Sequence, residues 1–310
     1  RHNFHIEKDW LIFSTGVVPI LSSVVRKLTT PAENVLIMTP VYNIFFNSIV
    51  NNGRNVLECP LSYNDGEYSI DFDALEDAMA QPQTTMMIFC NPHNPVGKIW
   101  DRDTIARVGE LAKKHHVIVV SDEIHCDITD PGKGYIPFAS VSDTCREISV
   151  TCVAPTKAFN MAGLQTAAAI VPDEFLRHKV NRGLNTDEVA EIAAFNEGGE
   201  WLDALREYIY ENKLIVDTYI KDQLPQVKLV KSEATYLLWL DCSAICSDSE
   251  KLADFIREKT GLYLSDGVQY GRTGESFLRL NVACPKSRLM DGLLRLKTGI
   301  DQYIGNDMNK

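Results

Sequence analysis

Seven short apolar runs alternate with amphipathic stretches over the first two-thirds of this 310-residue chain, and this alternation strongly constrains the fold. Between two of the runs, residues 101–115 carry an apolar stripe at helical spacing. Near-continuous Val/Ile runs separated by helices indicate a mostly parallel sheet that helices cover on both faces. The predicted strands are residues 10–13, 35–38, 56–59, 86–90, 117–121, 148–153 and 167–171. The sequence therefore predicts an α/β fold with a three-layer large domain, which would bind ligands at the carboxyl ends of its strands.

The pattern changes after residue 185, where a long helical region begins and runs to residue 223. Two strands, a helix and a closing helix are predicted after it, at residues 227–230, 236–240, 250–259 and beyond Pro285. This order is typical of an α+β domain. Because no Pro- or Ser-rich linker interrupts the chain, we expect a large domain of residues 1–200 packed closely against a smaller C-terminal domain of residues 201–310.

The composition excludes several classes of protein. A formal net charge of −11 argues against a nucleic-acid surface and against binding to anionic membranes. No apolar run approaches the ~20 residues that a membrane span needs, and the start of the sequence lacks a signal-peptide pattern. The eight cysteines are scattered, without the His or Cys partners of a zinc site. We therefore expect reduced thiols, no metal centre and a cytoplasmic location.

Lys157 lies on a short turn between two of the apolar runs, residues 148–153 and 167–171. Its four-carbon stem would lie among apolar neighbours, with the amine at the edge of the sheet. Such surroundings disfavour a charged amine and leave its lone pair free for Schiff-base chemistry. Taken alone, the same position would suit any buried lysine at a sheet edge.

Two polar residues follow other predicted strands. Asp122 closes an apolar strand, where a carboxylate needs a partner; a pyridinium nitrogen would be one, and a helix N-terminus or a metal ion would be others. Asn94 lies in a turn that two prolines stiffen and Gly97 ends. Its amide could donate a hydrogen bond to a phenolic oxygen, although turn chemistry alone explains most such strings.

An aromatic residue and a histidine extend this group. Tyr42 could stack on a planar ring, although alone it would fit a core aromatic equally well. His125 follows Asp122 by three residues, close enough to join a hydrogen-bond network at the same ring. A single histidine is more often structural.

Anion binding is predicted at two places. Residues 14–23 open a helix after a short strand, so the backbone amides of Val17 and Val18 could hold a phosphate. This segment is not a P-loop, and no G-x-G-x-x-G follows the first strand. Arg279 lies in an apolar strand of the second domain, where its guanidinium suits an α-carboxylate or an interdomain salt bridge. Together, the residues indicate a site for pyridoxal phosphate (PLP) and an amino acid.

Six segments in this order resemble the fold-type I, PLP-dependent aminotransferase superfamily (class I/II), specifically its cystathionine β-lyase branch of MalY/PatB-type C-S lyases. The resemblance covers nearly the whole chain. The segments are G-V-V-P (16–19), P-V-Y (40–42), N-P-H-N-P-V-G (91–97), S-D-E-I-H (121–125), the lysine turn (154–165) and R-L-N-V-A-C-P (279–285).

The resemblance implies a role for each matching residue. The lysine that matches Lys157 carries the cofactor as a Schiff base and moves the Cα proton. Asp122 matches the partner of the pyridine nitrogen, and Asn94 matches the contact of the phenolic oxygen. Tyr42 matches the stacking aromatic, and Arg279 matches the residue that binds the substrate carboxylate.

Three positions differ from ordinary aminotransferases. His125 stands where those enzymes commonly carry a tyrosine, Ala154 lacks a phosphate-binding hydroxyl, and Gln165 replaces a phosphate-binding arginine. The resemblance therefore implies phosphate binding by backbone amides and Thr156, as in the lyase branch. It also implies that an N-terminal arm precedes this sequence.

The implied activity is α,β-elimination on cystathionine- or cysteine-type substrates, which releases a thiol, pyruvate and ammonia. An aminotransferase would use the same residues and differ only in how the reaction ends. A catalytically silent, PLP-binding regulatory protein is the third alternative. The resemblance further implies a homodimer.

Overall fold

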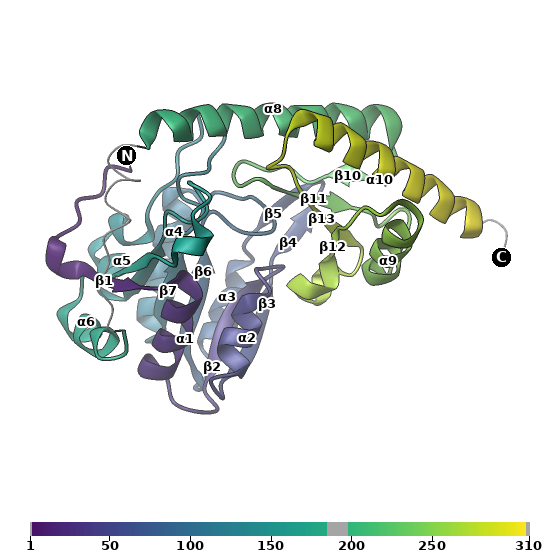
Figure 1. Cartoon of the computed structure of the whole chain (residues 1–310). Coiled ribbons are helices and arrows are strands. Elements are labelled where there is room, and N and C mark those ends of the chain that lie inside the picture. The colour runs from purple at the N-terminus through teal and green to yellow at the C-terminus, as the bar shows by residue number, and fades with distance from the viewer. Residues whose placement is uncertain (1, 185–197, 308–310) are drawn as a thin grey trace.

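The computed structural model describes residues 2–184 and 198–307 (Figure 1). A large sheet with its helices forms one side of the molecule, a smaller sheet forms the other, and helix α8 (Gly199–Gln223) runs along both. Among the described residues, no helix combines the length and the apolar character that a membrane crossing requires.

The large sheet has seven strands in the order β1-β9-β8-β7-β6-β2-β3. The pairs from β8 through β7, β6 and β2 to β3 are parallel, while β9 is antiparallel to both β8 and β1. All seven strands were predicted, and the mostly parallel sheet is confirmed. Their bounds are β1 (Leu11–Ser14), β2 (Asn34–Thr39), β3 (Asn55–Pro60), β6 (Thr84–Cys90), β7 (Ile118–Asp122), β8 (Ser149–Val153) and β9 (Ala167–Ile170).

Helices cover both faces of this sheet, as the apolar runs predicted. Successive strand residues point to opposite faces, so Val35 and Ile37 of β2 join one hydrophobic cluster while Leu36 and Met38 join another. The first cluster includes α1 (Val17–Leu28), α2 (Ile44–Val50) and α6 (Glu174–Asn181). The second includes α3 (Phe72–Met79), α4 (Arg102–Lys114) and α5 (Asp143–Glu147).

Helix α4 shows how the local sequence fixes an element. The Asp101 side chain accepts a hydrogen bond from the Thr104 amide at 2.8 Å, which satisfies one of the free donors at the helix start. Ile105, Val108 and Ala112 are buried on one face, against the sheet. The helix predicted for residues 101–115 is confirmed within one residue at each end.

The smaller sheet is antiparallel, in the order β10-β11-β13-β12. It packs under α8 with a third hydrophobic cluster, which also takes in Ile128 and Ala158 from the first part of the chain. The elements are β10 (Lys228–Leu229), β11 (Leu237–Asp241), α9 (Ser249–Thr260), β12 (Ser265–Asp266), β13 (Phe277–Asn281) and α10 (Lys286–Asp307). The α+β pattern is therefore confirmed, while the boundary at residue 200 stays a prediction.

Some elements lay outside the sequence predictions. They are the helices α2, α3, α5 and α6, the short strand β12, the hairpin β4 (Ser62–Asn64) and β5 (Glu67–Ser69), and the 3-10 helices η1 (Lys8–Trp10), η2 (Phe138–Ser140), η3 (Ala162–Leu164), η4 (Gly267–Tyr270) and η5 (Arg272–Gly274). The helical region predicted from residue 185 lies outside the described residues until residue 198.

Gly97 ends the turn that carries Asn94 and gives a test of the fold. Its φ is +74°, and a Cβ atom there would lie 2.4 Å from Ser232 Oγ. Gly66 has a φ of +83° with no atom within 4 Å of such a Cβ, so an alanine at this position adds backbone strain without a steric clash. We expect Gly66→Ala to lower the free energy of unfolding by about 1 kcal/mol, and Gly97→Ala to lower it by a further 1–3 kcal/mol or so because of overpacking.

Urea denaturation of both variants measures this difference. Equal losses in the two variants would show that the contact between Gly97 and the loop at Ser232 does not restrict the turn.

Candidate active site

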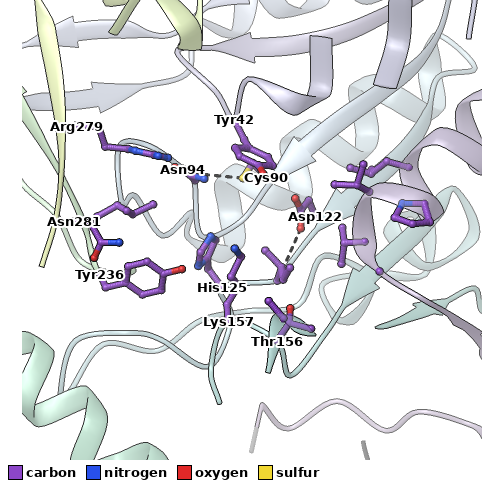
Figure 2. Close-up of a pocket in the computed structure, with 18 of the residues that line it drawn as sticks. Tyr42, Cys90, Asn94, Asp122, His125, Thr156, Lys157, Tyr236, Arg279 and Asn281 are labelled. Atoms are coloured by element: carbon purple, nitrogen blue, oxygen red, sulfur yellow. Dashed lines mark hydrogen bonds between the residues drawn. The ribbon is translucent and has the colours of Figure 1, made fainter. Parts of the chain in front are cut away.

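Every residue predicted for the site lines one cavity of about 390 Å³ (Figure 2). The cavity lies at the carboxyl ends of β6, β7 and β8 and is closed from the other side by the smaller sheet. The predicted residues that line it are Val17, Val18, Tyr42, Asn94, Asp122, His125, Thr156, Lys157 and Arg279. The structure therefore brings together side chains that are up to 262 positions apart in the sequence, from Val17 to Arg279.

Lys157 follows β8 on a tight turn. The turn is closed by the Phe159 amide, which donates to Pro155 O at 2.9 Å, and by the Met161 amide, which donates to Thr156 O at 3.0 Å. Lys157 is half-buried, and its amine points into the cavity beside His125 (Figure 2). The predicted position at the edge of the sheet is confirmed.

Asp122 is the last residue of β7 and is only 5% exposed. One carboxylate oxygen accepts a hydrogen bond from the Ile124 amide at 3.1 Å. Burial raises the pKa of this carboxyl to about 6, against the lowering effect of that hydrogen bond and of the Lys157 charge. In the described chain no helix begins at Asp122, so the alternative of a helix N-cap is wrong.

Asn94 and Tyr42 lie on one side of the cavity (Figure 2). Asn94 is buried, and its side-chain oxygen has no hydrogen-bond partner among the residues that the structure describes. Tyr42 is half-buried and packs edge-on against Phe45, with ring centres 5.8 Å apart, and it also lines the cavity. Burial, followed by the Asp122 charge, raises the pKa of the Tyr42 phenol. Both side chains thus present unused polar or aromatic surface to a ligand.

His125 is buried beside Lys157 and forms a T-shaped contact with Tyr236, with ring centres 6.0 Å apart. Burial, followed by the charges of Lys157 and Arg279, lowers its pKa to about 3, so the imidazole is neutral at pH 7. Within residues 2–184 and 198–307, its Nδ1 atom has no hydrogen-bond partner. A role of His125 in a network around a bound ring stays a prediction.

The start of α1 offers an anion site at one end of the cavity. Val17 and Val18 are its first two residues, and no side chain caps the helix, whose N-cap is Gly16. Amides at such an end are oriented toward a bound anion, and the helix dipole favours negative charge there. Thr156 lines the same cavity, whereas Gln165 is exposed and is not part of its lining.

Arg279 lies in the middle of β13, and it reaches the cavity from the side of the smaller sheet, together with Asn281 and Tyr236 (Figure 2). Its Nη2 atom donates to Ser265 Oγ at 3.3 Å, its guanidinium lies 4.8 Å from the centre of the Tyr270 ring, and its Nε atom is buried without a partner. The described residues place no carboxylate within ion-pair distance of it. The alternative of an interdomain salt bridge is therefore not supported.

Sequence reasoning missed several lining residues. Asn281 follows Arg279 by two positions in β13, so strand alternation could have placed it on the same face. Tyr236 reaches the cavity because β11 pairs antiparallel with β13, with Leu237 opposite Asn281. The local sequence carries no signal for that pairing. The other lining residues that were not predicted as site residues are Thr15, Gly16, Pro19, Leu21, Cys90, Ile124, Ala162 and Leu237.

Comparison with known proteins agrees with this geometry. A family described as aminotransferase class I and II matches residues 1–295. Cystathionine beta-lyase PatB of Bacillus subtilis is 42% identical over 309 residues, which cover 97% of this chain and 80% of PatB. Protein MalY of Escherichia coli is 31% identical over 314 residues, covering 97% of this chain and 79% of MalY.

A solved structure extends the comparison to three dimensions. Cystalysin of Treponema denticola, whose crystal structure contains pyridoxal 5'-phosphate, superposes with a TM-score of 0.94 at 33% identity. The match covers 97% of this chain and 79% of cystalysin. The chain therefore belongs to the class I and II aminotransferase family and, within it, to the branch of the MalY/PatB-type C-S lyases.

Proposed function

We propose that this protein is a PLP-dependent carbon–sulfur β-lyase that converts cystathionine- or cysteine-type amino acids into a thiol, pyruvate and ammonia. The observation that carries the proposal is the convergence of Lys157, Asp122 and Arg279 on one cavity. The name of PatB and the cofactor in the cystalysin structure support the same chemistry.

The cavity fits the cofactor at three points. The carboxyl of Asp122, buried with a single donor from the backbone, would be stabilised by a protonated pyridine nitrogen. The unpaired oxygen and the amide of Asn94 lie where polar groups of a ring can bond with them, beside the Tyr42 ring. The uncapped start of α1, with Thr156, would hold the phosphate.

When bound, PLP supplies an electron sink that stabilises negative charge on the substrate Cα atom. The chain supplies the rest. Arg279 binds the substrate carboxylate with its planar guanidinium and so orients the Cα–H bond. The Lys157 amine removes the Cα proton, the electron pair of the C–H bond forms the Cα–Cβ double bond, and the thiolate leaves with the electron pair of the Cβ–S bond. Water then hydrolyses the released enamine to pyruvate and ammonia. Asp122, as a carboxylate, would keep the pyridine nitrogen of the bound cofactor protonated.

The neutral state of His125 matters for this arrangement. Burial above all keeps the imidazole uncharged, and the positive charge of Arg279 adds to this effect. An uncharged neighbour does not repel the proton that Lys157 takes up.

The decisive test is to incubate the protein with PLP and L-cystathionine and to assay pyruvate and free thiol. We expect both products in equal amounts, and the same with L-cysteine, which releases hydrogen sulfide. Formation of glutamate from added 2-oxoglutarate, without pyruvate, would instead identify an aminotransferase. Cofactor absorbance without any turnover would identify a regulatory protein.

Lys157→Ala tests the link to the cofactor. We expect the variant to lose the absorbance band of a lysine-bound cofactor and all pyruvate formation, since it lacks the amine that forms the Schiff base. Lys179→Ala, which removes a lysine of α6 that lies over the Phe175 ring, serves as the control and keeps both. A retained band in Lys157→Ala with no amine added would contradict the assignment.

Asp122→Asn tests the burial of the carboxyl in the protein without cofactor. The pKa of Asp122 in the folded state, about 6, exceeds its ordinary value of 3.8, so the folded wild type loses stability as pH rises between these values. Asparagine does not titrate. We therefore expect the unfolding free energy of the variant, relative to wild type, to increase by roughly 2 kcal/mol from pH 4 to pH 7.

Urea denaturation at several pH values measures this change. A difference between variant and wild type that stays constant with pH would mean that Asp122 is not desolvated.

Two finer features belong to the same proposal. A cytoplasmic location is supported by the eight cysteines, which are all free thiols. Assembly into a homodimer is supported by the family resemblance, and gel filtration with light scattering would measure it.

A further inference from the structure

Helix α8 buries two adjacent polar side chains in its middle. Asn212 is 0% exposed and Lys213 is 5% exposed, although the face that they occupy packs against apolar residues. Burying an amide and an ammonium costs free energy, which hydrogen bonds offset, although the Asn212 Oδ1 atom has no partner among the described residues. Neither residue lines the cavity of the candidate active site. Their partners therefore show what the helix gains from them.

The Lys213 ammonium has three acceptors, one for each of its protons. It donates to Asp130 Oδ1 at 2.7 Å, to Ala234 O at 3.1 Å and to Ser232 Oγ at 3.3 Å. Asp130 lies on the segment that follows β7, and the other two acceptors lie on the loop before β11. One buried charge thus joins three parts of the chain.

The segment with Asp130 leads to His125. The Asp130 amide donates to Glu233 O at 3.0 Å, and the Thr235 amide donates to Ile128 O at 2.8 Å. The Ile128 amide in turn donates to His125 O at 3.0 Å. Lys213 therefore holds the backbone that positions His125.

The loop before β11 leads to Asn94. The Glu233 amide donates to Gly97 O at 2.9 Å, and the Gly97 amide donates to His93 O at 2.6 Å, which closes the turn that carries Asn94. Ser232 Oγ and Ala234 O, two of the three acceptors of Lys213, are also the atoms that a Cβ atom added at Gly97 would meet first. A shift of this loop would move the Asn94 turn directly.

Asn212 holds the other side of the cavity. Its Nδ2 atom donates to Val282 O at 2.8 Å and to Cys284 O at 2.9 Å. These carbonyls follow β13 immediately, and β13 carries Arg279 and Asn281. Neighbouring residues on a helix point about 100° apart, so a single turn of α8 reaches both sides.

We propose that Asn212 and Lys213 are a pair of positioning residues for the active site. Lys213 fixes the segments with Asn94 and His125, Asn212 fixes the strand with Arg279, and the rigid helix between them sets the separation of the two sides. This inference rests on the proposed function, in which the first side holds the cofactor and the second holds the substrate carboxylate.

Substitutions of Lys213 and of Asn212 should therefore weaken the binding of different ligands. Lys213→Met weakens PLP binding by roughly tenfold or more, because a displacement of about 1 Å in a positioned group has effects of this size. Asn212→Leu leaves PLP affinity unchanged but weakens the binding of glycine, which carries the carboxylate but has no leaving group. The readouts are the dissociation constants of PLP from titrated apoprotein and of glycine from the spectral change of the holoenzyme.

Two further variants separate positioning from simple loss of stability. Lys221→Met removes an exposed lysine of α8 that pairs with Asp217, and both affinities should match wild type. Asp130→Asn combined with Lys213→Met removes the carboxylate that Lys213→Met leaves unpaired. We expect this double variant to regain thermal stability while its PLP affinity stays low, because the bonds to Ala234 and Ser232 are still missing.

Each remaining outcome would overturn the inference. Wild-type PLP affinity in Lys213→Met, or recovery of both stability and affinity in the double variant, would reduce the pair to a structural role. Equal effects of Asn212→Leu and Lys213→Met on both ligands would show that they do not act on separate sides. Wild-type protein that binds no PLP would overturn the proposed function itself, and the positioning role with it.

Discussion

The whole arrangement depends on a sheet that is buried on both faces. Side chains on either face of its strands are mostly apolar, with a few small hydroxyl residues such as Ser121 and Thr151, so large polar side chains with a chemical task lie where strands end. Tyr42, Asn94, Asp122 and Lys157 follow or close β2, β6, β7 and β8, and parallel strands bring all four ends to one edge. The cavity is thus a consequence of how the core is covered.

The same burial explains the electrostatics of the site. A low-dielectric wall disfavours charge, which raises the pKa of Asp122 and lowers the pKa of His125. Without a ligand, the protein holds an acid and a base that are both pushed toward their neutral forms. A cationic ring nitrogen beside Asp122 would favour the charged form of this carboxyl group, whereas the His125 imidazole would stay neutral. The buried carboxyl of Asp122 therefore lowers the stability of the protein without cofactor, and a bound cofactor with a cationic nitrogen would offset this loss.

Much of this could be predicted from the sequence, because the information is local. Each strand of the large sheet is a contiguous apolar run, and β7 was displaced by only one residue from its prediction, residues 117–121. Residues that follow such runs were therefore placed correctly at the cavity. Tyr236 was not, because its position depends on the register between β11 and β13. The bonds of Lys213 and Asn212 were also beyond reach, since their partners lie 83 and 70 positions away.

The eight cysteines have a consequence for an enzyme that releases thiols. All of them are free and seven are buried, with Cys284 only partly accessible. A protein held together by disulfides would be attacked by its own product, since a thiolate exchanges with any disulfide that it can reach. Here no covalent cross-link exists to be reduced, and burial raises the pKa of Cys90, which lines the cavity, so that its thiol stays protonated and unreactive. The thiol that the active site would release therefore has no disulfide bond to reduce in this fold.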